Sequence, residues 1–561
     1  MYLVQGTVHE AFLASAQRYP ANDFLCVEGA TATRYGIDAR SFSYADAARE
    51  VESLRVRYSA AGLGAGQRVG LMLENRPAFF FHWLALNGLG ASVVPISREW
   101  RSAELEYLAG HSEIRAAVVP GERVEDLRRA GLQAGRSLGV TTPDLALLPE
   151  CGASDAGGSG AGSTARAGGM PGADGTAPDA NTECALLYTS GTTGRPKGCV
   201  LANEYFLWAG RWYADLGGLC RITPAAERLI TPLPMSHMNA MAFSTLAMLL
   251  SGGCIVPLDR FHPSTWWESV RESRATLVHY LGVMPAMLLG AATDRRDRDH
   301  AVRFGFGAGV APRLHASFEA RFGFPLLEAW AMTETGAGAV VIANREPRKV
   351  GTACFGQPEP RVEYRVVDEA GHDVRAGEPG ELLVRSAGAA PRFGFFREYL
   401  KEPEATAEAW RDGYFHTGDI VSRDPDGDFH FIDRKKNVIR RSGENISAAE
   451  VESVLLQHPQ IAGVGVTAVP DEVRGDEVMA CVVPRGALSD TEREAYALDV
   501  LRFCLERVAY FKAPGYVAIC KSLPLTATEK IQRARLKDLG RRLLGTPSCV
   551  DVRSLKKAAV A

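Results

Sequence analysis

The sequence lacks the features that would indicate a membrane, secreted or nucleic-acid-binding protein. None of the apolar runs in its 561 residues approaches the length of about 20 residues that a membrane-spanning helix needs. The N-terminal segment has no basic stretch followed by an apolar one. Lys and Arg number 63 against 66 Asp and Glu, so no strong basic field is available to hold nucleic acid. We therefore expect a protein that is neither membrane-embedded nor secreted and that binds no nucleic acid.

Cysteine is present, but it is not arranged for zinc or for a disulfide framework. The eleven cysteines include no C-x-x-C pair, and an odd number cannot pair completely. This pattern favours a reduced, cytoplasmic compartment.

Length and composition indicate a globular protein of more than one domain. Hydrophobic residues make up 46% and charged residues 23%, which are ordinary proportions. Because single hydrophobic cores stop growing near roughly 250–300 residues, a chain of 561 residues is expected to form two or more domains.

Helical and strand-like patterns alternate through most of the chain. A helical run over 43–64 is followed by the short apolar run 68–73, a second helical pattern over 77–89 and the strand-like run 91–96. This alternation predicts doubly wound α/β sheets as far as about residue 430. A new series of helical and strand-like patterns begins after residue 433, which predicts a smaller α/β domain there.

The most specific motif is the run Tyr188–Gly198, YTSGTTGRPKG, which follows a strand-like segment. Its glycines let backbone N–H groups curl around an anion, and its hydroxyls and lysine add donors and charge. The motif differs from the Walker A pattern, which places Gly-Lys-Ser/Thr at a fixed distance after its first glycine. We therefore predict a phosphate cradle that consists of Thr189, Ser190, Gly191, Thr192, Thr193, Gly194 and Lys197.

Four further segments accompany this cradle: EAWAMTET (328–335), YFHTGDI (414–420), DRKKNVIRRSGENISAAEVE (433–452) and LTATEKIQRARL (525–536). In this order they resemble the signature segments of the adenylate-forming superfamily, which includes acyl-CoA synthetases, luciferases and peptide-synthetase adenylation domains. The resemblance implies a large N-terminal AMP-binding domain over 1–435, made of doubly wound sheets. It also implies a smaller, mobile C-terminal α+β domain over 436–561.

The resemblance assigns roles to residues around the nucleotide. It implies that Trp330, which replaces the family's usual Tyr, stacks on adenine, and that Gly307 and Ala308 line the adenine pocket. Asp419 is expected to receive the two ribose hydroxyls, with Arg434 as a second ribose or phosphate contact.

Three residues are predicted to be catalytic. By the resemblance, Thr333 contacts the α-phosphate and Glu334 helps to hold Mg²⁺, an ion that needs few protein carboxylates when phosphates supply the other oxygens. Lys530 matches the family's catalytic lysine, whose ammonium bridges the attacking carboxylate and the α-phosphate. Two neighbours depart from the family pattern, since Ala331 and Glu529 each stand where Gly is usual.

The remaining assignments concern the acid, the thiol and domain movement. His237, Met238 and Gly309 are expected to line the acyl pocket. Met238 occupies the position where Asp would indicate binding of an α-amino group, so a simple organic acid is favoured over an amino acid. The resemblance further implies that Gly443 lines the tunnel for the thiol and that Lys436 is the hinge of the C-terminal domain.

The predicted function is ATP-dependent activation of a small carboxylic acid to acyl-AMP, with release of pyrophosphate, followed by transfer to coenzyme A. ATP, Mg²⁺ and coenzyme A are the expected cofactors, and a homodimer is one expected assembly. RRSGENIS and the neighbouring segments resemble those of the carnitine or crotonobetaine CoA ligase group. Two alternatives stay open: an adenylating enzyme that loads a carrier-protein thiol or stops at the adenylate, and a catalytically inactive nucleotide-binding regulator.

Overall fold

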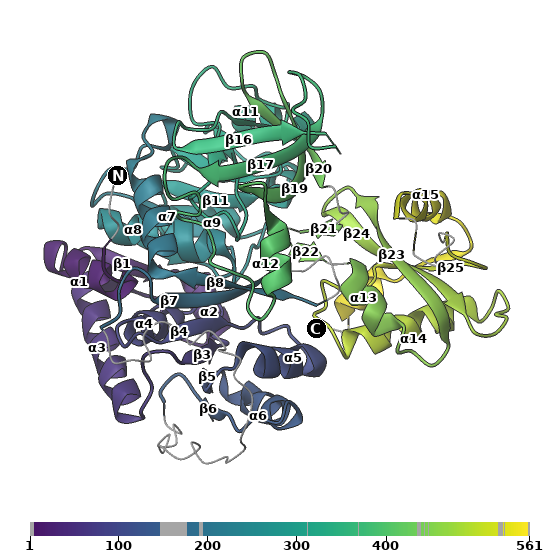
Figure 1. Ribbon diagram of the computed structural model, residues 1–561, viewed down its shortest axis with the longest axis horizontal. Helices are drawn as coiled ribbons and strands as arrows, with labels where there is room; N and C mark the ends of the chain where they lie inside the picture. The colour runs from purple at the N-terminus through teal and green to yellow at the C-terminus, as the bar shows by residue number, and fades with distance from the viewer. Residues whose placement is uncertain are drawn as a thin grey trace.

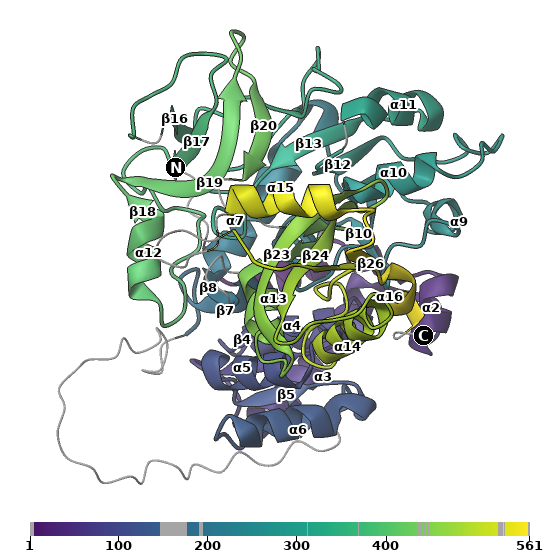
Figure 2. The same ribbon diagram turned by 90° about the vertical axis from the view of Figure 1, so that its right-hand side faces the viewer.

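The chain folds into a large body and a smaller one, which Figure 1 shows at the right in light green to yellow. The computed structural model describes residues 5–145, 177–189, 195–310, 312–368, 370–434, 439–442, 444–446, 448–524, 531 and 533–558. Figure 2 views the same molecule from the side of the smaller body, whose strands β23 and β24 overlie the centre of the large body. The fold class predicted from the sequence is confirmed, with a large N-terminal and a smaller C-terminal part.

The first sheet of the large body has the strand order β6-β5-β3-β4-β7-β8. Neighbouring strands are parallel except for β7 and β8, which form an antiparallel hairpin on either side of the predicted phosphate cradle. The runs 68–73 and 91–96 contain two of its strands, as predicted. The strands are β3 (Arg68–Leu71), β4 (Ser92–Pro95), β5 (Ala116–Val118), β6 (Gly139–Thr141), β7 (Glu183–Thr189) and β8 (Lys197–Ala202).

Local signals explain where the first two predicted helices begin. Helix α3 (Tyr44–Ala60) starts with a capping box, in which Ser43 and Asp46 each accept a hydrogen bond from the other's backbone amide. Helix α4 (Pro77–Asn87) starts with a proline, whose missing N–H would have no partner in the first turn. Both helices confirm the helical patterns over 43–64 and 77–89.

The second sheet has the order β14-β13-β12-β11-β9-β10-β1-β2 and is antiparallel only at its two edges. Its central strands are short and apolar, as expected for a parallel sheet buried on both faces. The strands are β1 (Asp23–Val27), β2 (Arg40–Ser43), β9 (Arg228–Thr231), β10 (Cys254–Pro257), β11 (Leu277–Leu281), β12 (Phe304–Ala308), β13 (Leu326–Trp330) and β14 (Val341–Ile342).

Helices cover these two sheets, and one apolar core includes residues from both of them. The helices are α1 (Val8–Arg18), α2 (Gly29–Tyr35), α5 (Ser102–Ser112), α6 (Val124–Gln133), α7 (Asn203–Asp215), α8 (Thr245–Ser251), α9 (Trp266–Glu272), α10 (Val283–Leu289) and α11 (Pro312–Phe322). Short 3₁₀ turns occur at η1 (Gly121–Arg123) and η2 (Gly218–Cys220). A turn of π-helix, η3 (Asn239–Ser244), leads directly into α8.

A third sheet in the large body is antiparallel, where the sequence patterns predict continued doubly wound structure. Its path is β15-β20-β19-β17-β16, with β18 paired to β19. Half-buried and buried residues alternate along much of β19, which is the pattern of a strand with one face more covered than the other. The elements are β15 (Cys354–Gly356), β16 (Val362–Val367), β17 (Gly380–Ser386), α12 (Pro403–Ala409), β18 (Trp410–Arg411), β19 (Tyr414–Arg423) and β20 (Phe429–Arg434).

The smaller body has its own sheet, of order β22-β21-β24-β25-β26 with β23 paired to β24, and two apolar clusters of its own. The domain boundary predicted at 435/436 lies outside the described residues and stays a prediction. The elements are β21 (Ile439–Arg441), β22 (Glu444–Ile446), α13 (Ala448–Leu455), β23 (Ile461–Asp471), β24 (Gly475–Pro484), α14 (Arg493–Leu505), β25 (Tyr516–Ile519), α15 (Arg533–Leu543), β26 (Cys549–Asp551) and α16 (Arg553–Ala558).

A buried charge cluster joins the two bodies. Lys512 Nζ of the smaller body lies 2.9 Å from Glu104 Oε1 on α5 and 2.7 Å from Glu450 Oε1 on α13. All three side chains are buried. Burial alone lowers the pKa of Lys512, but the two carboxylates outweigh burial and raise that pKa, so the ammonium stays charged.

Within the described ranges, no helix combines the length and the apolar character that are needed to cross a bilayer. The ten cysteines that the structure describes are all free thiols.

Candidate active site

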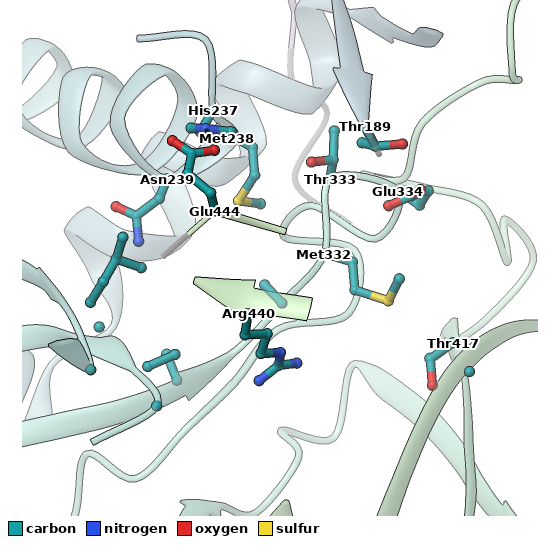
Figure 3. Close-up of a pocket in the computed structure, with 18 of the residues that line it drawn as sticks. Thr189, His237, Met238, Asn239, Met332, Thr333, Glu334, Thr417, Arg440 and Glu444 are labelled. Atoms are coloured by element: carbon teal, nitrogen blue, oxygen red, sulfur yellow. Dashed lines mark ion pairs between the residues drawn. The ribbon is translucent and has the colours of Figure 1, made fainter. Parts of the chain in front are cut away.

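A cavity of about 1280 Å³ lies where the large body meets the smaller one. Its walls include the end of β7, the start of β8, the end of β12 and the turn after β13, together with β19 and the hairpin β21–β22. The carboxyl ends of parallel strands in α/β folds are the usual place for a ligand site. Figure 3 shows Thr189, Thr333 and Glu334 on one side of this cavity and His237, Met238 and Asn239 on another.

The predicted phosphate end combines residues from two distant segments. Thr189 and Lys197 are paired across the β7–β8 hairpin and both line the cavity. Lys197 Nζ lies 3.6 Å from Glu402 Oε2 and 4.7 Å from the centre of the Tyr399 ring. Its ammonium is therefore held at the wall beside the cradle by a carboxylate and an aromatic face.

Glu334 lies next to this lysine, and Tyr399 links the two. The Glu334 side chain is only 7% exposed, and its Oε1 accepts a 2.9 Å hydrogen bond from the Tyr399 hydroxyl. Burial, followed by the charge of Glu334, raises the pKa of Tyr399, so this hydroxyl keeps its proton and donates it. Thr333 also lines the cavity, and its carbonyl oxygen accepts a 2.9 Å hydrogen bond from the Tyr205 hydroxyl.

The end of β12 and the loop that follows it bring Gly307, Ala308 and Gly309 to the cavity wall, where the adenine and acyl pockets are predicted. A buried carboxylate holds this loop. Glu328 accepts hydrogen bonds from the Gly309 amide at 2.9 Å, from the Val310 amide at 3.2 Å and from the Tyr280 hydroxyl at 2.8 Å.

Trp330 and Asp419 contact each other behind the cavity wall. The Trp330 indole N–H donates a 2.9 Å hydrogen bond to Asp419 Oδ2, and both residues are buried. Neither side chain lines the cavity, although Gly418 and Thr417 beside Asp419 do. Their predicted adenine and ribose contacts remain predictions.

Replacing Asp419 with alanine is expected to lower both ATP affinity and the melting temperature. The change leaves the buried Trp330 N–H without its acceptor, which typically costs about 1–3 kcal/mol. Asp419→Asn, in contrast, keeps an oxygen for Trp330 and is expected to melt near the wild type while still binding ATP more weakly. Calorimetric titration with ATP and thermal melts test both variants. Unchanged ATP affinity in Asp419→Asn would remove the Asp419 charge from the nucleotide site.

His237 and Glu444 form an ion pair between the predicted acyl wall and the smaller body. Their Nε2 and Oε2 atoms are 3.5 Å apart, and the His237 side chain is 47% exposed to the cavity. Burial lowers the pKa of His237, but the hydrogen bond and charge of Glu444 outweigh it and raise that pKa. The imidazolium is therefore favoured while the hairpin is docked.

A rise from about pH 6 to about pH 8 is expected to loosen this docking. His237 has a folded pKa above its ordinary 6.5, so the stabilisation is present below 6.5 and is lost as pH rises through the raised value. Burial and then the charge of Glu444 raise the pKa of Glu99 to about 7. Glu99 therefore gains its negative charge over the same pH interval, and its repulsion of Glu444 also loosens the docking.

Hydrogen exchange of the hairpin amides, corrected for intrinsic pH dependence, measures this loosening. The change is expected to be smaller in His237→Gln and absent when Glu99→Gln is added. A pH response of wild-type size in the double variant contradicts the assignment.

Several predicted site residues lie outside the described residues. These are Ser190, Gly191, Thr192, Thr193, Gly194, Lys436, Gly443 and Lys530, and of Arg434 only the backbone is described, paired with Asp419. Their roles stay predictions.

Sequence reasoning missed three residues that hold the others in place: Tyr399, Glu328 and Glu444. Tyr399 lies more than sixty positions from Glu334, and nothing in its local sequence marks it. Glu328 and Glu444 do lie inside quoted family segments, EAWAMTET and RRSGENIS. Glu328 stands in a run that otherwise has the pattern of a buried strand. Because a buried carboxylate needs hydrogen-bond partners, its presence there was a usable signal of a specific role.

The fold and the cavity together define a two-body α/β enzyme. The β7–β8 hairpin and an apolar wall line the same cavity. Residues 12–393 match the family model of the AMP-binding enzyme, and residues 450–530 match that of the AMP-binding enzyme C-terminal domain. The chain belongs to the AMP-binding enzyme family. Its predicted membership of the adenylate-forming acyl-CoA synthetases is thereby confirmed.

Curated relatives match almost the whole chain. A crotonobetaine/carnitine–CoA ligase of Citrobacter koseri is 30% identical over 502 residues, which cover 89% of this chain and 93% of that protein. The protein of the same name from Shigella flexneri is 29% identical over 503 residues, covering 88% and 93%.

Solved structures share the fold. An o-succinylbenzoate CoA synthetase of Bacillus subtilis has a TM-score of 0.77 at 22% identity, covering 95% of this chain and 98% of that one. An amide bond synthetase of Marinactinospora thermotolerans has a TM-score of 0.74 at 22% identity, covering 94% and 99%.

Proposed function

We propose that the protein joins a small carboxylic acid to coenzyme A in two steps driven by ATP. In the first step, a carboxylate oxygen attacks the α-phosphorus, and the bond to the leaving pyrophosphate breaks to give acyl-AMP. In the second, the thiol sulfur attacks the acyl carbon, the bond to AMP breaks and the thiol proton passes to solvent. No covalent enzyme intermediate takes part.

One observation carries this proposal: a single cavity has a polar, phosphate-type end and an apolar wall. Thr333 and Glu334 lie on one side of it and Met238 on another (Figure 3). Lys197, beside the predicted cradle, and Phe243, on the same segment as Met238, also line it. An acid whose chain lies on that wall presents its carboxylate toward the nucleotide phosphates. Such positioning supplies much of the rate in a reaction between two bound substrates.

Glu334 fits the role of a magnesium ligand. Its carboxylate is buried, lies at the cavity and keeps one oxygen fixed by Tyr399. Over the described residues, no group of three or more His, Cys, Asp or Glu side chains could hold a metal ion alone. Bound by Glu334, Mg²⁺ would take its other ligands from phosphates and water, and it would supply positive charge beside the phosphates.

The pose of the smaller body fits the second step. Arg440 and Glu444, on either side of the predicted thiol-tunnel residue Gly443, line the cavity. On either side of the catalytic candidate Lys530, the described residues Pro524 and Ile531 do not line it. We infer that the smaller body turns between the steps, so that Lys530 reaches the α-phosphate during adenylation.

Coenzyme A is the proposed acceptor because relatives that match nearly the whole chain are named CoA ligases. A carrier-protein thiol and a catalytically inactive regulator are less favoured. The free cysteines in the described part agree with the proposed cytoplasmic location. A homodimer stays a prediction that light scattering can test.

Pyrophosphate release with ATP, Mg²⁺ and a panel of carboxylic acids tests the function, with and without coenzyme A. We expect sustained turnover and a thioester product, seen by mass spectrometry, only when coenzyme A is present. Glu334→Gln is the control, and its pyrophosphate release is expected to fall about 10²–10³-fold because a charge at the transferring phosphate is lost. Thioester formation only on a carrier protein would favour the first alternative. ATP binding without turnover on any acid would favour the inactive regulator.

A further inference from the structure

An apolar recess opens from the cavity between η3 and the sheet strands β11 and β12. Its walls are Met238, Asn239, Phe243, Leu281 and Phe306, all of which line the cavity. His279 is the register partner of Phe306, and Leu281 is the partner of Ala308, so these side chains share one face of the sheet. That face points toward η3, because His279 bonds to Asn239 and Ser244.

His279 is a buried, neutral imidazole beneath the recess. Its ring stacks on Phe306, with ring centres 4.7 Å apart, and burial lowers its pKa to about 3. A neutral imidazole has one N–H donor and one acceptor nitrogen. Its Nε2 lies 3.0 Å from the Tyr213 hydroxyl, and its Nδ1 lies 2.6 Å from Asn239 Oδ1 and 2.8 Å from Ser244 Oγ.

The side-chain oxygen of Asn239 indicates which nitrogen of His279 carries the proton. Asn239 Oδ1 can only accept and lies 2.6 Å from Nδ1, so Nδ1 carries the hydrogen. Ser244 Oγ, 2.8 Å from the same nitrogen, then also accepts, and the Ser244 hydroxyl donates to the Asn239 backbone oxygen at 3.1 Å. Nε2 therefore accepts from the Tyr213 hydroxyl.

The same contact holds the side-chain amide of Asn239. Its oxygen, rather than its NH₂ group, faces His279 Nδ1 at 2.6 Å. The NH₂ group then points away from the histidine toward the recess. No acceptor among the described residues bonds to Asn239 Nδ2, and the atom is not sealed off from the cavity. The recess thus presents one fixed donor in an apolar wall.

From this geometry we propose that the substrate is a small carboxylic acid with a hydrogen-bond-accepting oxygen, a carbonyl or hydroxyl, on its chain, which Asn239 Nδ2 recognises. The inference rests on the proposed function, since it names the class of acid that the enzyme activates. His279 is a positioning residue that holds the amide in the productive orientation.

The recess is not arranged for a cationic chain. Its named walls, Met238, Asn239, Phe243, Leu281 and Phe306, include no acidic residue, and the acid on the adjoining hairpin, Glu444, is paired with His237. A quaternary ammonium group there would face the positive end of the Asn239 amide dipole. An oxygen acceptor satisfies that donor, whereas a plain alkyl chain leaves it without a partner.

Matched acids test the proposal in the full-length enzyme. The probes are butanoate, hexanoate and octanoate, the oxo acid of each with the ketone next to the terminal methyl, and crotonobetaine as a cationic acid without a chain oxygen. Initial rates of ATP-, Mg²⁺- and coenzyme-A-dependent pyrophosphate release give kcat/KM. We expect at least one oxo acid to exceed its matched alkanoate about 10- to 100-fold, because the alkanoate loses a hydrogen bond and leaves a buried donor unpaired.

Two variants assign the effect to the amide. Asn239→Leu, of similar size but without a donor, is expected to lower kcat/KM for the preferred oxo acid at least tenfold more than for its alkanoate. Asn239→Asp keeps an oxygen for His279 and replaces the donor with a carboxylate oxygen, so preference is expected to move toward crotonobetaine. Melting temperatures check that both variants fold.

Activity on alkanoates or on crotonobetaine, with no oxo acid preferred by the wild type, overturns this inference and leaves the proposed function standing. An oxo-acid preference that survives in Asn239→Leu also overturns it. The absence of pyrophosphate release from every acid in the panel, in a protein that still binds ATP, overturns the proposed function and this inference together.

Discussion

Replacing Lys530 with alanine is expected to slow acyl-AMP formation from ATP and free acid about 10²–10³-fold. The variant loses a charged donor where negative charge builds on the α-phosphate. Thioester formation from supplied acyl-AMP and coenzyme A is expected to stay within a few-fold of the wild type. The reason is that, in the proposed mechanism, the smaller body turns between the steps and brings this lysine to the phosphate only during adenylation.

The two half-reactions are measured separately, with Lys521→Ala, an exposed lysine of the same body, as the matched control. A parallel loss of both half-reactions would make Lys530 a structural or coenzyme-A-contacting residue. If neither falls, Glu529 has displaced the lysine from the path of reaction.

Glu104→Gln is expected to have the opposite pattern: a loss of about 10- to 100-fold in thioester formation, with adenylation little changed. Glu104 is the large body's carboxylate in the buried cluster with Lys512 and Glu450. Removing its charge weakens a charge-assisted hydrogen bond between the two bodies, which the proposed turn of the smaller body would break. Lys512 keeps Glu450 as a partner within the smaller body, so that body is expected to stay folded.

Glu106→Gln is the control, because Glu106 is exposed on the same helix, α5. The glutamine at 104 can still accept the Arg101 amide at the start of that helix, as Glu104 Oε2 does. Equal losses in both half-reactions, or a wild-type thioester rate, would show that this cluster does not control the pose.

The predictable parts of the molecule are those whose signals are local. The capping box at Ser43 and the proline at the start of α4 act within one helical turn, and both helices occur where the sequence patterns place them. The glycine-rich motif is likewise recognisable from a few residues, and its flanks Thr189 and Lys197 both line the cavity.

The parts that escaped prediction depend on contacts between distant segments. The bond from Tyr399 to Glu334 and the bond from His279 to Asn239 each join residues that only the assembled fold brings together. The antiparallel sheet from β15 to β20 was hidden for a related reason, because apolar runs alone do not report which strand pairs with which.

The π-helical turn η3 also bears on how the substrate specificity of such an enzyme can change. Asn239 and Phe243 lie on this single turn, whereas the nucleotide end is built from the β7–β8 hairpin and the segment after β13. Wide helical turns of this kind are frequent at functional sites. The walls that we propose to face the acid and the nucleotide come from separate stretches of chain, so residues 239–244 can be exchanged without changing the residues at the proposed nucleotide end. Such an exchange would change which acid binds, while the residues proposed to bind ATP stay the same.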